Sequence, residues 1–346
     1  MKVVVNAKNG ARDFECGPGE KILHAGLRSG VELPYECATG TCGTCKARLV
    51  SGSAESVWSD APGRRYFKSE TDLLMCQSVA HADCALEVGG MLRPREPGVA
   101  APRVLTGVVR ACRRLTHDVV AVDLDIDQPL DFHAGQFALV TVPGIAGARA
   151  YSMTNFERRA QRLSFVVKRK PGGAVSDWLF GDGVEGAVLD LVAPLGHATF
   201  HPDVRKHVLC IAGGSGIAGM MSILSLACQA AYFASWDGHV FFGVRTARDA
   251  FFFDELEALR ARYPARLSVT VALSDEDVPA SLAGDYPKFA FARGLVHAVA
   301  GERMAGRFAD VRAYVAGPPP MVDASLRLLL REARLRPDDI RYDKFS

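Results

Sequence analysis

Four cysteines in the first quarter of the chain have a spacing that suits metal binding. Cys37, Cys42 and Cys45 form a C-x4-C-x2-C pattern, and Cys76 follows after thirty intervening residues. This spacing is typical of proteins that hold a [2Fe–2S] cluster through four thiolates. Glycines in the loop let its backbone fold closely around the sulfides and point N–H groups at sulfur. The pattern therefore predicts an iron–sulfur cluster near the surface, within reach of an electron acceptor.

The same cysteines leave one alternative, a structural zinc site, which would also use four thiolates. Zinc sites usually combine two C-x2-C pairs, and Cys76 has no such partner nearby. The nine cysteines cannot all pair within one chain, and clustered cysteines in a reducing compartment are more often metal ligands than disulfides. The other five are expected to be ordinary buried thiols: Cys16, Cys84, Cys112, Cys210 and Cys228.

A second group of candidate residues is Arg149-Ala150-Tyr151-Ser152, at the end of an expected strand. This segment matches the R-x-Y-S pattern of the ferredoxin-NADP reductase family. The resemblance implies that Arg149 binds a flavin pyrophosphate with planar, bidentate donors. It also implies that Tyr151 lies against the isoalloxazine ring and that Ser152 hydrogen-bonds near the flavin N5. Four residues alone also fit a cross-strand pair that binds no ligand.

A glycine-rich turn supports the flavin interpretation. Gly172, Gly173 and Ser176 lie where a short helix is expected to begin, and a helix N-terminus with free N–H groups binds anions. Two phosphate-binding elements on one barrel favour FAD over FMN. Val167 and Lys168 lie on the strand between them, which the resemblance places beside the flavin ring and the adenosine.

A glycine motif later in the chain indicates a nucleotide site. Gly213, Gly214, Ser215 and Gly216 follow a buried strand and open a helix. In that context glycines admit a pyrophosphate to the helix N-terminus. The alternative is a tight strand-to-helix turn with no ligand. The motif and the resemblance together predict a site for a nicotinamide nucleotide.

The choice of nucleotide depends on the end of the next strand. That strand ends in Arg245, where the Rossmann fingerprint places an acidic residue. NADH-using members of the resembled family carry an aspartate slightly later, which corresponds to Asp249 and implies contact with the ribose hydroxyls. Arg245 and Arg248 offer the alternatives, a site for the 2′-phosphate of NADPH or solvated loop charges. We expect NADH, with NADPH as the second choice.

Two C-terminal segments complete the expected site. Gly317 and Pro318 resemble the C-G-P-P motif that lines the nicotinamide side in this family, with Ala316 in place of the cysteine. We therefore expect no thiol to act in hydride transfer. The resemblance also places the last residues at the flavin ring, where Phe345 would stack and move aside for the nicotinamide. A frayed tail is the alternative. Ser152 and Phe345 are thus the candidate catalytic residues.

Composition and strand patterns divide the chain into the parts that must position these residues. Residues 1–92 resemble a plant-type ferredoxin, a β-grasp fold, and the proline-rich stretch 93–102 is typical of a stiff linker. Short strands separated by turn residues predict an antiparallel β-barrel flavin domain over 103–204. Strands that alternate with helices predict an α/β doubly wound nicotinamide-binding domain over 205–346. The predicted fold class is therefore multidomain.

Charge and hydropathy exclude several other classes of protein. The net charge of +2 gives no reason to expect binding to nucleic acid or to a membrane surface. No apolar run is long enough to cross a bilayer, and the N-terminal segment is typical of a strand and a turn rather than a signal peptide. We therefore expect a cytoplasmic protein, and we expect it to be a monomer.

The order of ferredoxin, flavin barrel and nicotinamide domain is similar to that in the reductase components of bacterial multicomponent oxygenases. The resemblance implies electron transfer from NADH through FAD and the [2Fe–2S] cluster to a terminal oxygenase hydroxylase component or its Rieske-type ferredoxin. Di-iron hydrocarbon monooxygenases (toluene, phenol and methane types) are the nearest group. The alternatives are the reductase of a Rieske dioxygenase or of a sugar deoxygenation system, a cluster-based redox sensor, and a zinc-bound module. The linker at 93–102 would limit or permit swinging of the ferredoxin part.

Overall fold

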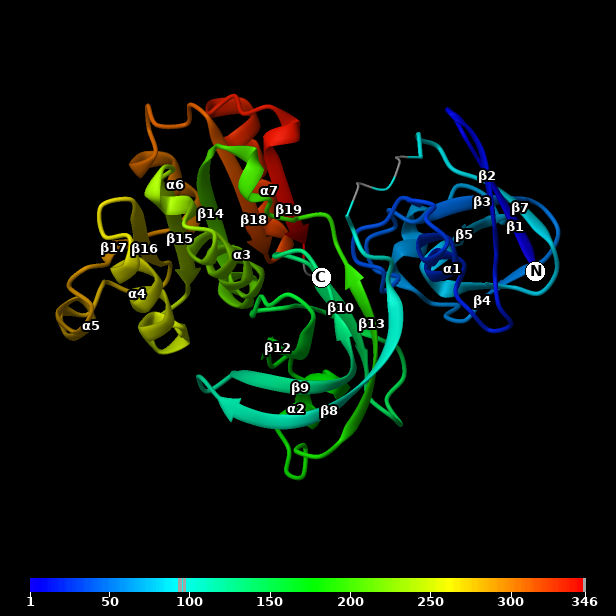
Figure 1. The fold of residues 1–346 in the computed structure, drawn as a ribbon, viewed down its shortest axis with the longest axis horizontal. Coiled ribbons are helices and arrows are strands. Elements are labelled where there is room, and N and C mark those ends of the chain that lie inside the picture. Colours follow the sequence, from blue (N-terminus) through cyan, green and yellow to red (C-terminus); the bar gives the residue numbers. More distant parts are fainter. Residues whose placement is uncertain (93–94, 96–97, 345–346) are drawn as a thin grey trace.

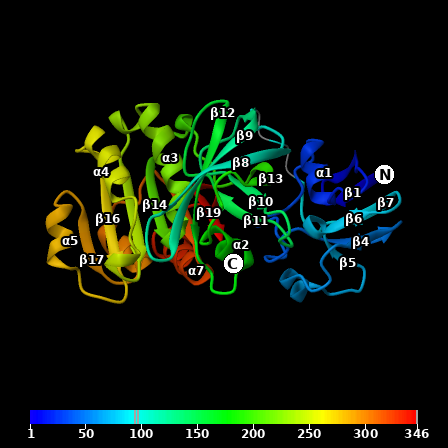
Figure 2. The ribbon, with the colours of Figure 1, turned by 90° about the horizontal axis from the view of Figure 1, so that it is seen from below.

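Three main sheets organise the chain in the computed structural model (Figure 1). The structure describes residues 1–92, 95 and 98–344. The N-terminal part lies at one end of the molecule, the barrel in the middle and the α/β part at the other end (Figure 2). The predicted fold class, with a β-grasp part, an antiparallel barrel and a doubly wound part, is confirmed.

The N-terminal sheet packs against a single helix. Its elements are β1 (Lys2–Ala7), β2 (Gly10–Glu15), α1 (Ile22–Arg28), β3 (Lys46–Ser51), β4 (Ala54–Ser56), η1 (Pro62–Tyr66), β5 (Asp72–Leu74), η2 (Met75–Gln77), β6 (Ser78–Ala80) and β7 (Cys84–Glu87). The strand order is β2-β1-β7-β3-β5, and β4 pairs with β6. Val3 and Val5 alternate with less buried neighbours along β1, as a strand with one covered face requires. Helix α1 buries Ile22 and Leu23 in the same core.

The middle part is a six-stranded antiparallel sheet that curves into a barrel. Its elements are β8 (Arg103–Arg114), β9 (Val119–Leu130), β10 (Phe137–Thr141), β11 (Arg149–Ser152), β12 (Ala160–Lys168), α2 (Ala174–Leu179) and β13 (Val188–Leu195). The strand order is β11-β10-β13-β8-β9-β12, with every pairing antiparallel. A bridge between Met153 and Phe165 joins the two edges. The barrel therefore closes beside Ser152.

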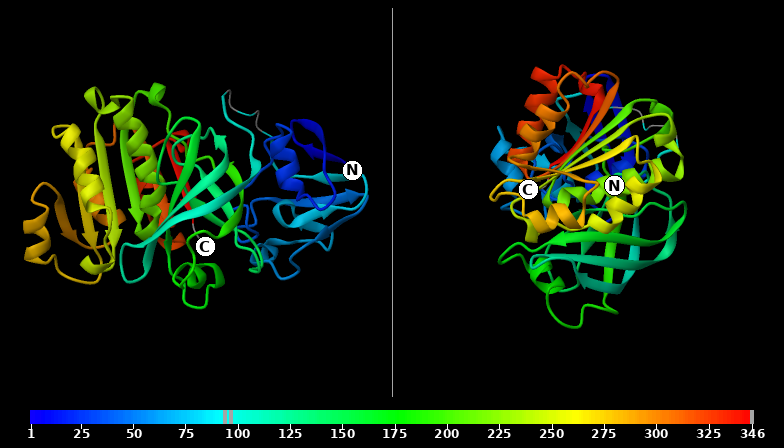
Figure 3. Two further views of the ribbon diagram at one scale, coloured as in Figure 1. Left: turned by 60° about the horizontal axis from the view of Figure 1, so that its bottom comes forward. Right: turned by 90° about the vertical axis from the view of Figure 1, so that its left-hand side faces the viewer.

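The third part is a parallel sheet with helices on both faces (Figure 3). Its elements are η3 (Pro202–Val204), β14 (His207–Gly213), η4 (Gly214–Gly216), α3 (Ile217–Gln229), η5 (Tyr232–Ala234), β15 (Gly238–Val244), η6 (Ala247–Asp249), α4 (Phe253–Arg262), β16 (Leu267–Leu273), α5 (Ala280–Asp285), β17 (Ala290–Arg293), α6 (Val296–Arg303), β18 (Val311–Gly317), α7 (Pro319–Arg327), η7 (Leu328–Glu332), η8 (Pro337–Asp339) and β19 (Ile340–Lys344). The strand order is β17-β16-β15-β14-β18-β19. Alternate residues of β14 point to opposite faces: Val208 and Cys210 pack with α3 and α4, while Leu209 and Ile211 pack with α6 and α7.

The C-terminal segment differs from the frayed alternative. Residues Ile340–Lys344 form edge strand β19, which pairs with β18 in parallel. Phe345 lies outside the described residues, as do 93, 94, 96 and 97 of the expected linker. The roles given to Phe345 and to the linker therefore stay predictions. Within the part of the chain that the structure describes, no helix is long and apolar enough to span a bilayer.

Candidate functional site

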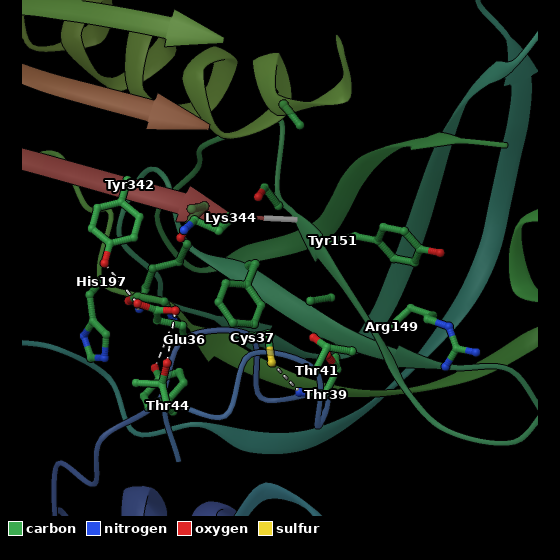
Figure 4. A pocket seen from close by; sticks show the side chains of 18 of the residues that line it. Glu36, Cys37, Thr39, Thr41, Thr44, Arg149, Tyr151, His197, Tyr342 and Lys344 are labelled. Atoms are coloured by element: carbon green, nitrogen blue, oxygen red, sulfur yellow. Dashed lines mark hydrogen bonds between the residues drawn. The ribbon is translucent and has the colours of Figure 1, made fainter. Parts of the chain in front are cut away.

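A cavity of about 880 Å³ lies where the three parts of the chain meet (Figure 4). Its wall comes from the loop that carries Cys37, Cys42 and Cys45, from strands β10, β11 and β12, from the turn after β14 and from strand β19. The predicted site residues in this wall are Cys37, Arg149, Tyr151, Ser152, Lys168, Gly173, Ser176 and Ser215. Motifs that are far apart in the sequence thus share one cavity.

The four predicted metal ligands lie close to one another, and Cys37 among them lines the cavity. The sulfur atoms of Cys45 and Cys76 are 3.2 Å apart. The backbone N–H groups of Thr39 and Cys42 each donate to Cys37 Sγ at 3.4 Å. The hydrogen bond that the two thiols share lowers the pKa of Cys37 and raises that of Cys42. Backbone N–H groups that point at a cysteine sulfur suit a metal ligand.

In the cluster loop, residues 37–45, two glycines lie where neighbouring side chains leave no room for a Cβ atom. Gly40 and Gly43 have φ angles of +89° and +78°, which favour glycine. A Cβ atom on Gly43 would lie 2.3 Å from the ring of Tyr66, and one on Gly40 would lie 2.8 Å from the side chain of Gln77. The side chains of Tyr66 and Gln77 therefore pack directly against the loop that carries the cysteines.

A half-buried cation lies behind the cysteines and was not singled out from the sequence. Lys21 Nζ donates to Gln77 Oε1 at 3.4 Å, and Gln77 Nε2 donates to Cys76 Sγ at 3.8 Å. Burial lowers the pKa of Lys21, while the negative charges of Cys76 and Cys45 act in the opposite direction. Charge and hydrogen bonds near the sulfurs tune the reduction potential of such a cluster. A lone lysine forms no motif, so only the fold reveals this contact.

On the barrel side of the cavity, Ser152 carries a buried hydroxyl that has no partner. Ser152 is 4% exposed, and its Oγ makes no hydrogen bond within the described part of the chain. An unpaired buried hydroxyl costs roughly 1–3 kcal/mol. A Cβ atom on Gly219 of α3 would lie 3.6 Å from Ser152 Cβ. The hydroxyl therefore lies between the barrel and the helix that follows the nucleotide-site glycines, where a bound molecule would satisfy it.

The two other residues of this segment differ in exposure. Burial raises the pKa of Tyr151 to about 12, so its phenol stays neutral. Arg149 is exposed, and among the residues that the structure describes its guanidinium donates only to the carbonyl of Ala148, at 3.1 Å. Figure 4 shows both side chains on the barrel wall. The guanidinium therefore keeps most of its donors for a ligand.

Strand β12 presents alternate residues to the cavity. Val166 and Lys168 line the wall, whereas the side chain of Val167 packs in the barrel core. Lys168 Nζ forms an ion pair with Asp118 Oδ2 at 3.1 Å. Val166 therefore presents its side chain to the cavity, and the predicted contact of Val167 with the flavin stays a prediction.

The glycine turn before α2 is tied by its own serine. Ser176 Oγ accepts a hydrogen bond from Lys170 N at 3.0 Å and donates to the carbonyl of Gly173 at 2.9 Å. Gly172 has a φ angle of +73°, and a Cβ atom on Gly173 would lie 2.8 Å from Ser176 Oγ. The serine hydroxyl therefore shapes the turn, and the phosphate contact expected of this segment stays a prediction.

The nucleotide-site glycines gather at the carboxyl ends of two neighbouring strands. Gly213 ends β14 and Gly317 ends β18, and a Cβ atom on Gly317 would lie 3.0 Å from Gly213 O. A Cβ atom on Gly216 would lie 2.2 Å from the carbonyl of Ala316. Gly214 has a φ angle of +53° and open space beside it. Ligands of open α/β sheets bind at such an edge.

The proline after β18 sets the direction of the next helix. Pro318 is the N-cap of α7, with φ −61° and ψ 144°, and its ring lies near Gly213. Ser215 follows Gly214 and reaches the cavity wall. The two motifs that were predicted separately thus meet at one place in the sheet.

Asp249 already has partners in the structure. Its Oδ2 accepts hydrogen bonds from Thr246 N at 2.9 Å and from Thr246 Oγ1 at 2.7 Å, and its Oδ1 lies 3.7 Å from His117 Nε2. Burial raises the pKa of Asp249, but the Thr246 hydrogen bonds outweigh it and the net shift is downward. Arg245 is exposed just after β15. The carboxylate caps η6, so its predicted contact with ribose stays a prediction.

Three residues outside the motifs hold the cluster loop against the other two parts. Tyr35 OH accepts a hydrogen bond from the backbone N–H of Gly196 at 2.9 Å. Glu36 Oε1 accepts from Tyr342 OH at 3.0 Å, and Glu36 Oε2 accepts from Thr44 Oγ1 at 3.1 Å (Figure 4). The side chain before Cys37 is thus bonded both to strand β19 and to the cluster loop.

Apolar packing continues across the same junction. One cluster of buried residues contains the core of the N-terminal part together with Phe137, Leu139 and Leu195 of the barrel. Asp343 of β19 lines the cavity, and burial raises its pKa to about 7. The N-terminal part is therefore packed against the barrel, with its cysteine loop turned toward the residues predicted to hold the flavin.

The side chains present fit the predicted groups. Backbone N–H groups aimed at Cys37 suit a cluster ligand, and the unpaired Ser152 hydroxyl with the exposed Arg149 suits a flavin nucleotide. The open, left-handed Gly214 at the carboxyl edge of the sheet suits a nucleotide pyrophosphate.

Three family models match successive stretches of the chain. They are a 2Fe-2S iron-sulfur cluster binding domain over residues 5–81, an oxidoreductase FAD-binding domain over 107–200 and an oxidoreductase NAD-binding domain over 210–326. Their order is the one expected from the motifs.

Relatives match nearly the whole chain. The ferredoxin–NAD(P)(+) reductase CarAd of Metapseudomonas resinovorans is 36% identical over 95% of this chain and 96% of its own length. The ferredoxin–NAD(+) reductase component of the alkene monooxygenase system of Xanthobacter autotrophicus is 35% identical over 97% and 99%. A solved structure, the ferredoxin reductase in carbazole 1,9a-dioxygenase, has a TM-score of 0.82 and 32% identity over 100% of this chain and 99% of that one.

Proposed function

The chain belongs to the family of ferredoxin–NAD(P)⁺ reductases that serve as reductase components of oxygenase systems, and on that premise we propose that it delivers electrons from NADH to the terminal oxygenase, or to the ferredoxin, of such a system. It is an NAD(P)H-dependent flavin iron–sulfur oxidoreductase. One observation carries the proposal: Cys37 and Ser152 line the same cavity. A cluster ligand and a flavin-side hydroxyl thus face a common space.

Each group of site residues has its own proposed role: binding the flavin phosphates, contacting the flavin ring or holding the cluster. FAD held here would supply the chemistry that turns a two-electron donor into single electrons for the cluster. Arg149 supplies fixed, planar donors for the pyrophosphate. Ser152 would offer its buried, unpaired hydroxyl to the flavin, and the neutral phenol of Tyr151 would add no charge beside it. Cys37, Cys42, Cys45 and Cys76 would hold the cluster.

The glycine segments would hold the phosphates and the nicotinamide. The turn of Gly172, Gly173 and Ser176 serves the FAD phosphates together with Lys168. The turn from Gly213 to Gly216 receives the NADH pyrophosphate, and Gly317 with Pro318 borders its nicotinamide end. In this account Val167 contributes through its backbone, because its side chain points into the barrel.

NADH is the proposed donor. The alkene monooxygenase relative is named as an NAD(+) reductase, which supports this choice. The competing observation is the exposed Arg245, whose charge suits the 2′-phosphate of NADPH. A comparison of kcat/KM for NADH and NADPH decides the point: preference for NADH supports the proposal, and preference for NADPH overturns it.

The proposed acceptor is a terminal oxygenase hydroxylase component or a Rieske-type ferredoxin. A monooxygenase system is the first candidate because of the alkene monooxygenase relative, and a dioxygenase system is the second because of the carbazole 1,9a-dioxygenase reductase. We also propose that the protein acts as a monomer in the cytoplasm. Reconstitution with each purified acceptor, followed by NADH-dependent reduction, tests the assignment. Failure to reduce either class would overturn it.

A further inference from the structure

The cluster loop has two sides with different neighbours. Cys37, Thr39 and Thr41 line the cavity and face the barrel residues (Figure 4). The ring of Tyr66 covers the loop at Gly43, as shown by the 2.3 Å contact that a Cβ atom there would make. Tyr66 is not part of the cavity wall and is 46% exposed. The exposed ring of Tyr66 thus covers the cluster loop from outside the cavity wall, although Pro62 at the start of the same helix lines the cavity.

The short helix η1 brings cations to this second side. The N–H of Gly63 donates to the carbonyl of Gly40 at 2.8 Å, which fastens η1 to the cluster loop. The guanidinium of Arg65 lies over the Tyr66 ring at 4.8 Å and donates to Tyr66 OH at 2.9 Å. Arg64 lies over the Phe67 ring at 4.9 Å. Both arginines are therefore held in place by aromatic rings rather than by acids.

We call Arg64, Arg65, Tyr66 and Lys68 the exit patch. All four are exposed, and none of the three cations forms an ion pair with a carboxylate within the described residues. The nearest sequence acids, Asp60 and Glu70, are exposed as well, so three positive charges stand against two negative ones in this segment.

Three acidic residues near the cluster loop, Glu32, Glu36 and Asp72, already have partners outside the exit patch's side chains. Glu32 pairs with Arg95 at 3.0 Å, and Glu36 accepts the hydrogen bond from Tyr342. Asp72 accepts from Lys46 at 3.2 Å and from the backbone of Lys68 at 2.7 Å. These three acids therefore already have partners, whereas the cations of the exit patch form no ion pair within the described residues, although residues 1–92 carry ten basic and eleven acidic side chains overall.

We propose that the exit patch is the docking surface for the electron acceptor, and that this acceptor is a protein with acidic side chains around its redox centre. The inference rests on the proposed function. Arginine and tyrosine are the residue types that dominate binding energy at protein interfaces, and unpaired charges steer a partner of opposite sign. Because the patch lies outside the cavity, the acceptor binds while the cluster loop stays against the barrel.

Charge reversal at the patch tests the proposal in the holoprotein. The NADH-reduced protein is mixed in a stopped-flow with the acidic haem domain of cytochrome b5 or with basic cytochrome c, and the return of the oxidised cluster absorption is followed. Each event moves one electron from the reduced cluster to a ferric haem. For Arg64→Glu/Arg65→Glu we expect the rate with the acidic haem protein to fall by about tenfold at low salt, and the rate with cytochrome c to rise. Arg12→Glu on the remote strand β2 is the matched control.

A binding measurement gives an independent result. A carbodiimide joins lysine amines to carboxylates in contact, so cross-linking to the acidic haem protein should occur at Lys68 and disappear at high salt. If the charge-reversed protein behaves like the Arg12→Glu control, or if cross-links form at other lysines, the exit patch is wrong while the reductase function stands. If the wild-type protein reduces neither haem protein, the proposed function itself fails.

Discussion

The cluster loop and the flavin wall border the same cavity but are built in different ways. Three of the four cysteines lie within nine residues, and backbone N–H groups of that same loop donate to the sulfurs of Cys37 and Cys42. The flavin wall combines strands β10, β11 and β12 with the turn after β14 and strand β19. The first region is local and the second depends on packing between distant segments. Substitutions in the two regions should therefore affect different steps.

The largest expected effect comes from the loss of a cluster ligand, which should stop electron delivery by the cluster and leave reduction of the flavin unchanged. Cys76→Ser removes one of four ligands, so we expect loss of the cluster absorption and of electron delivery to protein acceptors. Reduction of the flavin by NADH should persist, because the flavin wall contains no part of Cys76. Stopped-flow absorption measures both steps. Full acceptor reduction without the cluster would show that electrons leave from the flavin directly, against the account.

A substitution in the flavin wall should have the opposite pattern of effects. Arg149→Ala removes charge-assisted donors worth roughly 1.5–3 kcal/mol, so we expect FAD to bind about 10- to 100-fold more weakly. The cluster absorption should not change. FAD affinity is measured by fluorescence titration. Arg162→Ala is the control, because Arg162 lies on the neighbouring strand β12 and pairs with Asp125 at the surface. Equal losses in both variants would contradict the assignment of Arg149.

The junction between the two regions gives a smaller effect. Tyr35→Phe leaves the buried N–H of Gly196 without its acceptor, which costs roughly 1–3 kcal/mol. We expect slower flavin-to-cluster electron transfer and lower stability toward urea, with unchanged reduction of the flavin by NADH. Tyr286→Phe removes a surface hydrogen bond to Asp254 and serves as the control. An unchanged transfer rate would show that Tyr35 does not position the cluster loop.

The smallest expected effect is confined to the cluster. Lys21→Gln removes a positive charge behind Cys76, which disfavours the reduced, more negative state. We expect the midpoint potential to fall by roughly tens of millivolts. A redox titration followed by electron paramagnetic resonance measures this shift, with the exposed Lys8→Gln as control. A rise in the potential would contradict the placement of this charge near the cluster.

The same contrast explains what the sequence could predict. The ligand spacing, the loop glycines and the order of the three folds are local signals, so the motifs indicated them without the structure. The family resemblance placed the strand of Val167 beside the flavin, but it did not show that the side chain of Val166 faces the cavity. Asp249 suited a ribose contact by position, yet its hydrogen bonds to Thr246 appear only once η6 is folded.

Residues at the junction carried no signal at all. Tyr35 meets Gly196 across 161 positions of the chain, and Glu36 meets Tyr342 across 306. Such contacts depend on how separately folded parts pack, which no spacing rule encodes. The sequence also left open whether the C-terminal segment is ordered or frayed, and only the fold shows that residues 340–344 pair with β18. Phe345 itself stays a prediction.

The central claim is that electrons pass from NADH through the flavin wall to the cluster loop within one chain. Anaerobic titration of the purified protein with NADH, followed in the visible spectrum and by electron paramagnetic resonance, tests it most directly. The account predicts that flavin and cluster absorptions both bleach and that the signal of a reduced [2Fe–2S] cluster appears. A bleached flavin beside a cluster that stays oxidised would contradict it.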